Sequence, residues 1–211
     1  MHKKIDETMI NRLREKVASI LSPQRFSHTL GVEQMAFRIG SELAIDSDGL
    51  NVLRCAALLH DITKEYSFEK QLKICDEFGI ILRDDEISCP QILHAITASS
   101  IISCEHSDFN IPEIVSAVRW HTTGKRNMSV FDKIICLSDF IEDGRKYDSC
   151  VSIRNDFWAE MKSCTGNENK LLCLDNSLRL SLEATVDNIT NKGGIVNLDT
   201  IEAIESLFAS R

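Results

Sequence analysis

Apolar residues recur every three or four positions along almost the whole chain, and no segment shows the strict alternation of a half-buried strand. Ser22 and Pro23 stand where the N-cap and the first position of a helix are expected. The spacing therefore predicts an all-α fold. The predicted helices cover residues 24–43, 47–59, 67–78, 90–105, 112–121, 129–142, 150–162, 169–190 and 198–208.

The breaks between these segments are short and carry turn residues, and the chain contains neither an internal repeat nor a linker. The weakest place is the polar run 166–169, which we expect to form a mobile loop. The run 192–194, which holds two glycines, separates a C-terminal helical tail. We therefore predict a single domain over residues 1–211.

Composition agrees with long helices, because only 9 glycines and 3 prolines occur among 211 residues. Lys and Arg number 24 against 32 Asp and Glu, a formal charge of −8. This excess argues against general binding to nucleic acid or to anionic membranes, which needs an extended basic surface. The charged N-terminal segment does not resemble a signal peptide, and no run approaches the ~20 apolar residues of a spanning helix. We expect a cytoplasmic protein.

The eight cysteines are scattered without a C-x-x-C pair, so a zinc site built of thiolates is not expected. Most of them stand among apolar residues, and we interpret these as reduced thiols that fill the core.

Histidines and aspartates interrupt apolar helical stretches at several places. A carboxylate in such a position is costly unless something pairs with it. If the helices pack side by side, a shared cation can satisfy these groups, and imidazole with carboxylate suits iron, manganese, zinc or nickel. The number of these histidines and aspartates exceeds the four ligands that one tetrahedral structural metal needs, so a catalytic site with one or two ions fits better. The residues are His28, His60, Asp61, His94, His121 and Asp139.

Structural explanations compete with this interpretation when each residue is taken alone. His94 or His121 alone is more typical of a hydrogen-bonded core histidine, and Asp139 alone could form a salt bridge. His106, in a polar context, is expected to be an exposed helix end outside the site. No serine stands in a G-x-S-x-G motif, which disfavours a Ser-His-Asp hydrolase.

The order H…HD…D, formed by His28, His60-Asp61 and Asp139, resembles the signature of the HD-domain metal phosphohydrolases. Five longer blocks resemble the bacterial YqeK family of symmetrical diadenosine tetraphosphate hydrolases, over about residues 8–150 and more loosely over 199–203. The chain departs from that family at Ala98-Ser99, at Glu142-Asp143-Gly144 and at Trp120. The blocks are Arg25–Val32, Ala57–Lys64, His94-Ala95, Arg119–Gly124 and Asp139–Arg145.

This resemblance implies a single HD-domain helical bundle, with a metal-binding core at about 20–145 and a C-terminal helical extension at about 150–211. It also implies a divalent metal, iron first and manganese, zinc or nickel as alternatives. Asp61, His94 and His121 would be catalytic, and His94 and His121 would hold a second metal if two ions bind. The metal ligands would be His28, His60, Asp61 and Asp139.

Several further residues would contact the substrate. Lys64 lies one helical turn after Asp61, and Arg145 follows the predicted helix of Asp139, so both could reach phosphate. Ordinary solvated charges or salt bridges are the alternative for these charged groups. For Trp120, which could stack on a base, the alternative is a buried packing role. The expected substrate contacts are Lys64, Arg145, Arg25, Trp120, His94 and His121.

The resemblance implies cleavage of diadenosine tetraphosphate into two molecules of ADP. Two alternatives remain open: an HD phosphohydrolase acting on another nucleotide or an alarmone, and a non-catalytic nucleotide-sensing HD domain. The expected partners are a dinucleoside polyphosphate or an ADP-type nucleotide, with no nucleic acid and no membrane. A homodimer stays open, as does the question of whether the C-terminal helices cover the site or complete the core.

Overall fold

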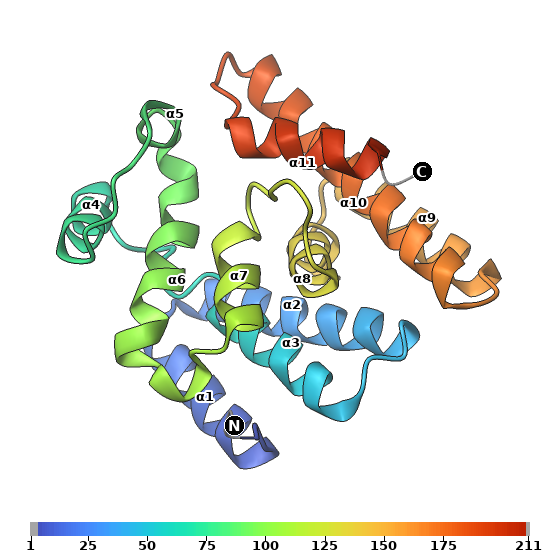
Figure 1. The fold of residues 1–211 in the computed structure, drawn as a ribbon, viewed down its shortest axis with the longest axis horizontal. Helices are drawn as coiled ribbons and strands as arrows, with labels where there is room; N and C mark the ends of the chain where they lie inside the picture. Colours follow the sequence, from blue (N-terminus) through green and yellow to red (C-terminus); the bar gives the residue numbers. More distant parts are fainter. Residues whose placement is uncertain (1–3, 210–211) are drawn as a thin grey trace.

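The computed structural model describes residues 4–209, which form eleven α-helices and two short 3-10 turns without a strand (Figure 1). The prediction of an all-α fold is confirmed. The 3-10 turns are Pro90–Ile92 and Ser107–Phe109. The helices are α1 (Glu7–Ile20), α2 (Pro23–Glu42), α3 (Ser47–Leu59), α4 (Phe68–Glu77), α5 (Asp84–Ile87), α6 (Leu93–Glu105), α7 (Pro112–Trp120), α8 (Val130–Ile141), α9 (Asp148–Ser163), α10 (Asn167–Asn191) and α11 (Leu198–Ala209).

Capping residues in the sequence fix where the central helices begin. The Ser22 hydroxyl accepts a hydrogen bond from the Arg25 amide at the start of α2, with Pro23 in the first turn. Asp46 caps α3 in the same way, and Ser129 forms a capping box with Asp132 at α8. Each cap satisfies amides that lack a partner within the helix, a contribution of about 1 kcal/mol.

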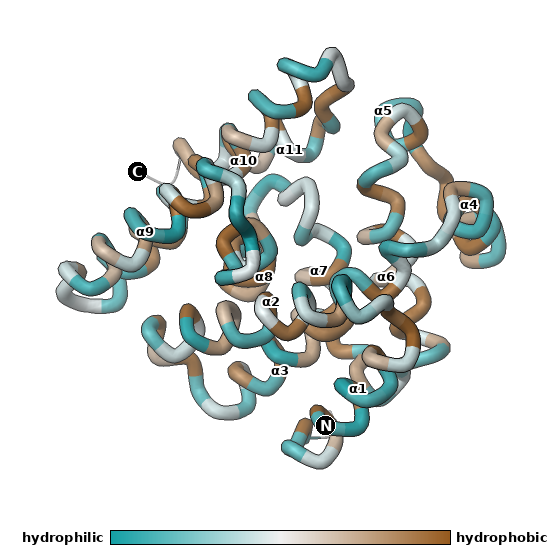
Figure 2. The backbone as a smooth tube through the Cα atoms, turned by 180° about the vertical axis from the view of Figure 1, so that it is seen from behind, coloured by the Kyte–Doolittle hydropathy of each residue, from teal (hydrophilic) through white to brown (hydrophobic). Residues whose placement is uncertain are grey.

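The centre of the fold is a packed group of four helices, in which α3 contacts α2, α7 and α8. Their facing side chains are fully buried, among them Ile39, Leu58, Ile114 and Ile134. Burial of each such side chain stabilises the fold by about 1.5–3 kcal/mol. Because this packing fixes the helices against one another, it also fixes the polar residues at their ends. Figure 2 shows hydrophilic positions on the outward turns of α4 and α9, away from this centre.

The C-terminal helices complete the same core. Helix α10 contacts α8, α9 and α11, and Figure 1 shows these three C-terminal helices together on one side of α8. Phe157, Leu174 and Leu178 are fully buried in the cluster that also contains the central helices.

Two local predictions differ from the structure. Helix α1 lies outside the predicted segments, although Ile10, Leu13 and Val17 are buried at helical spacing between its charges. The expected loop at 166–169 is instead the start of α10, because only Gly166, with φ +81°, remains outside the helix. The break at 192–194 is present, and Gly193 there has φ +69°.

All eight cysteines are free thiols, and six of them are buried, as expected for core fillers. Over residues 4–209, no helix combines the length and apolar character needed to cross a bilayer.

Candidate metal centre

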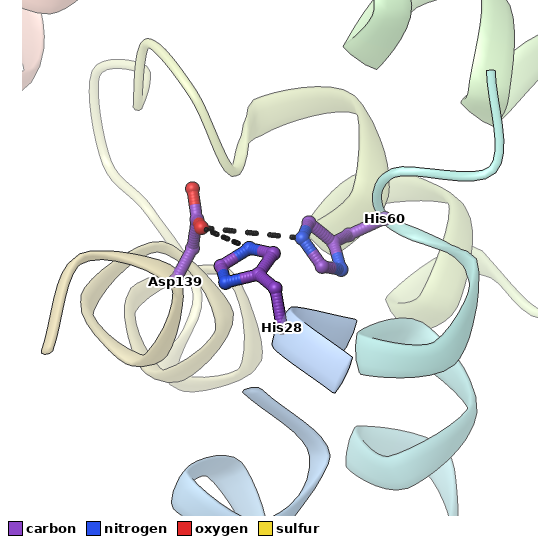
Figure 3. A group of neighbouring side chains, drawn as sticks. All are labelled: His28, His60 and Asp139. Atoms are coloured by element: carbon purple, nitrogen blue, oxygen red, sulfur yellow. Dashed lines mark ion pairs between the residues drawn. The ribbon is translucent and has the colours of Figure 1, made fainter. Parts of the chain in front are cut away.

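Three of the expected ligands meet where α2, α3 and α8 come together (Figure 3). His28 lies in the first half of α2, His60 directly follows α3, and Asp139 lies near the end of α8. Asp139 Oδ1 lies 3.0 Å from His28 Nε2 and 4.0 Å from His60 Nε2. Two rings from different helices therefore point their Nε2 atoms at one carboxylate oxygen.

Asp61 lies at the middle of the larger cluster and is only 2% exposed. Its Oδ2 lies 3.4 Å from His60 Nε2 and 3.8 Å from His28 Nε2. Its Oδ1 lies 3.3 Å from His94 Nε2 and 3.7 Å from His121 Nε2. One buried carboxylate thus faces two pairs of imidazoles, one pair with each oxygen.

Hydrogen bonds to the backbone fix the orientation of three of these rings. His60 Nδ1 donates to the Ala57 carbonyl at 2.6 Å. The Nδ1 atoms of His94 and His121 likewise donate to carbonyls three residues earlier, at 2.8 and 2.7 Å. A ring with its proton on Nδ1 presents a lone pair on Nε2, the form that binds a metal. All three lone pairs therefore face Asp61.

The spacing of the Nε2 atoms fits a cation. The Nε2 atoms of His28 and His60 are buried without a hydrogen-bond partner. Those of His94 and His121 lie 3.0 Å apart, although both carry lone pairs. Two nitrogen ligands about 2.1 Å from one ion, at a right angle, would be separated by about 3.0 Å. A cation between the rings would remove the repulsion of the two lone pairs.

The described residues include two sets of three possible ligand atoms, and within each set the atoms all lie within 4.8 Å of one another. One set comes from His28, His60 and Asp139, and the other from His60, Asp61 and His121. These two sets contain five of the six expected ligands, and each could hold a metal ion. The sixth, His94, adjoins them through its contact with Asp61.

Glu142 is a member of this site that the sequence analysis did not include among its site residues. His28 Nδ1 donates to Glu142 Oε1 at 3.2 Å, and the amide of Gly144 donates to the other oxygen. Glu142 is only 3% exposed. A Cβ at Gly31 would overlap Glu142 Oε2, so the glycine makes room for the carboxylate. The resemblance quoted Glu142 within a block, but the block says nothing of its contact with His28.

The electrostatics of the cluster favour bound cations. Burial alone would raise the pKa of Asp139, but the His28 ring, 3.0 Å away, and the charge of Arg145 hold it well below its usual range. Burial would lower the pKa of His28, yet the adjacent carboxylates of Asp139 and Glu142 raise it to about 9. The position of His28 thus attracts positive charge, whether a proton or a metal ion.

The other side of the cluster is neutral. Burial, and next the charge of Lys64, lower the pKa of His94, and burial is also the main reason that the pKa of His121 is lowered. Both rings are therefore neutral at pH 7. Neutral imidazole is the form that coordinates a divalent cation.

Three cations surround these groups. Arg25 Nη1 donates to Asp61 Oδ2 at 2.8 Å, and Arg145 Nη2 donates to Asp139 Oδ1 at 2.7 Å. Lys64 Nζ lies 3.2 Å from His94 Nε2. Arg25 and Arg145 thus form the ion pairs that were the alternative to phosphate binding, but they do so within the cluster itself.

Two other residues lie away from this cluster. Trp120 lies directly before His121, and the guanidinium of Arg119 covers its ring at 4.1 Å. The prediction that His106 is exposed is wrong, because His106 is 4% exposed. It follows α6 and lines a pocket together with Met9 and Leu13 of α1, which are distant in the sequence.

The HD-domain family model matches residues 25–143, more than half of the 211 residues. Three curated relatives are named symmetrical bis(5'-nucleosyl)-tetraphosphatase. The protein from Staphylococcus aureus is 29% identical, over 69% of this chain and 73% of its own. Those from Halalkalibacterium halodurans and Bacillus subtilis are each 27% identical, over 64% of this chain and 69% of their own.

A solved structure resembles almost the whole chain. It is a crystal structure from Clostridium acetobutylicum, described as a predicted HD superfamily hydrolase involved in NAD metabolism. The two chains are 28% identical and superpose with a TM-score of 0.81, over 95% of this chain and 97% of that one. The likeness therefore includes the C-terminal helices as well as the residues matched by the family model.

Proposed function

Because the chain belongs to the HD-domain family of phosphohydrolases, we propose that its cluster of histidines and aspartates binds a divalent metal and cleaves diadenosine tetraphosphate symmetrically into two molecules of ADP. The names of the three tetraphosphatase relatives support this substrate. One structural observation carries the proposal: the buried carboxylate of Asp61 faces His28 and His60 with one oxygen and His94 and His121 with the other.

His28, His60, Asp61 and Asp139 are the proposed ligands of the metal. Imidazole nitrogens mixed with carboxylate oxygens suit iron, with manganese, zinc or nickel as alternatives. When bound, such a cation lowers the pKa of water from 15.7 toward about 7 and neutralises charge on phosphate oxygens.

His94 and His121 are proposed to support a second cation together with Asp61. Because their Nδ1 protons are donated to backbone carbonyls, their Nε2 atoms hold no proton for a leaving group. This arrangement favours the role of ligand over that of general acid. Asp61 would then be the carboxylate shared by the two halves of the site.

The surrounding cations are proposed to bind the phosphate chain. Arg25 and Arg145 donate to carboxylate oxygens that a metal would also contact, so their guanidinium groups lie beside any phosphate drawn to the metal. Lys64 would neutralise charge at the His94 side of the site. Water adds its oxygen to a central phosphorus, the bond to the central bridging oxygen breaks, and ADP leaves with that oxygen.

Product analysis on a panel of nucleotides tests this proposal. Metal-loaded protein is incubated with diadenosine tetraphosphate, a deoxynucleoside triphosphate and a guanosine alarmone, and the products are separated by chromatography. The proposal predicts rapid turnover of the dinucleotide, with ADP as its product. Formation of AMP and ATP would contradict symmetrical cleavage. Faster turnover of another nucleotide would identify that nucleotide as the substrate in place of diadenosine tetraphosphate.

A further inference from the structure

Two cavities border the metal centre. The first has a volume of about 360 Å³ and lies between α8 and α10, where Phe140 and Leu182 form apolar parts of its wall. The second has a volume of about 770 Å³ and lies between the start of α2 and the segment after α8, where Ser27 and Gln24 line it. Both volumes are in the range of ligand pockets, about 300–1,000 Å³.

The two cavities meet at the metal centre. His121 and Asp139 line the first, whereas Arg25 and His28 line the second. Arg145 lines both. A ligand that filled both cavities would therefore have its middle beside the ligand atoms of the cluster.

The chemistry of the shared wall suits a nucleotide with two ends. Tyr147 also lines both cavities, and it is 72% exposed, so its ring is available for stacking on a base. Arg145 supplies a guanidinium for the phosphates between the bases.

The outer walls add polar groups of the kind that read base edges. In the first cavity, the side-chain amide of Asn188 has no hydrogen bond within residues 4–209, so it can both donate and accept. The hydroxyl of Ser27 and the amide of Gln24 are likewise free within the described chain in the second cavity.

We infer that the two cavities hold the two nucleoside ends of one dinucleoside polyphosphate, with the phosphate chain crossing Arg145 and the metal cluster. This inference rests on the proposed function, because it takes its ligand from there. It gives the C-terminal helix α10 a role in binding the substrate. It also gives a reason for cleavage in the middle of the chain, since a ligand anchored at both ends places its central phosphorus atoms at the metal.

Binding stoichiometry tests the inference without requiring turnover. The probes are ADP and a diadenosine tetraphosphate analogue in which a methylene group replaces the central bridging oxygen. Both are titrated into metal-loaded protein by calorimetry. We expect one analogue per chain and two ADP per chain. A single ADP per wild-type chain would overturn the inference.

Matched substitutions locate the two ends. Asn188→Trp fills the first cavity and Ser27→Trp fills the second, and both positions are exposed on helices. Thr190→Trp, also exposed on α10 but lining neither cavity, is the control. Each filling variant should bind one ADP and bind the analogue at least tenfold more weakly, whereas the control should match the wild type.

The outcomes separate this inference from the proposed function. Full affinity for the analogue in either filling variant, with its metal content and melting temperature unchanged, would overturn the inference that the two cavities hold the two nucleoside ends. If the protein binds two ADP per chain but does not hydrolyse diadenosine tetraphosphate, the proposed function is rejected. The inference that each cavity holds one nucleoside end is then retained.

Discussion

Replacing Glu142 by glutamine should weaken metal binding, although Glu142 is not itself proposed as a ligand. The carboxylate accepts hydrogen bonds from His28 Nδ1 and from the Gly144 amide. A glutamine has one oxygen to accept with, so one of these bonds is lost, and the negative charge behind the ring is lost as well. His28 would become a less basic and less firmly oriented ligand.

The magnitude follows from the loss of a partner to a metal-binding histidine. Such losses cost 10–100-fold in metal affinity, or about 1.4–2.7 kcal/mol. Gly31→Ala should have a similar effect, because the added Cβ would overlap Glu142 Oε2 and displace the carboxylate from His28. In a Glu142→Ala background the space is vacated, so Gly31→Ala should cost little more.

The assay is competition for metal against a chelator of known affinity, with the exposed Glu168→Gln at the start of α10 as a control for charge loss. A loss within twofold for Glu142→Gln would refute the reasoning. Equal additional losses for Gly31→Ala in both backgrounds would show that the glycine acts independently of Glu142.

Four further predictions concern the cluster and its surroundings. Asp61→Ala should abolish turnover with an unchanged circular dichroism spectrum, whereas full activity would refute the metal site. Lys64→Ala should raise the KM for the dinucleotide about tenfold by removing a charge beside the phosphates, and unchanged kinetics would make it a structural charge. Metal at a hundred times its Kd should raise the Tm by about 5–10 °C, and chelation should reverse this. Burial, then Lys16, lower the pKa of His106 from 6.5 to about 4, so the unfolded chain takes up the proton first and the free energy of unfolding falls between pH 6.5 and 4. His106→Gln should remove about 1–2 kcal/mol of that loss, allowing for solvent screening, and an unchanged urea-unfolding profile would refute it.

Helical periodicity and capping residues were sufficient to predict most of the fold. Ser22 and Pro23 mark a helix start that the structure retains, because capping is a local interaction. Helix α1 was missed since its charges hide the apolar positions that bury against α3. The start of α10 was also missed, because the polar residues after Gly166 resemble a loop until the helix packs on α8 and α9.

The candidate site was predictable as far as it consists of polar residues in apolar stretches. Such positions stand out in a sequence because burial of an unpaired charge is costly. Glu142 could not be assigned a role in this way, since its partner His28 lies 114 residues away and only the folded chain brings them together. His106 was misjudged for a related reason, because Met9 and Leu13 of α1, far away in the sequence, lie beside this polar segment only in the folded chain.

Hydrolysis of diadenosine tetraphosphate in water labelled with oxygen-18 tests the central claim most directly. Attack of water on a central phosphorus predicts ADP as the sole product, with one labelled oxygen on the terminal phosphate of half of the ADP molecules. The reaction should stop on chelation and resume when metal is restored. Intact substrate in the metal-loaded protein, or label in AMP or ATP, would contradict a metal-dependent symmetrical hydrolase.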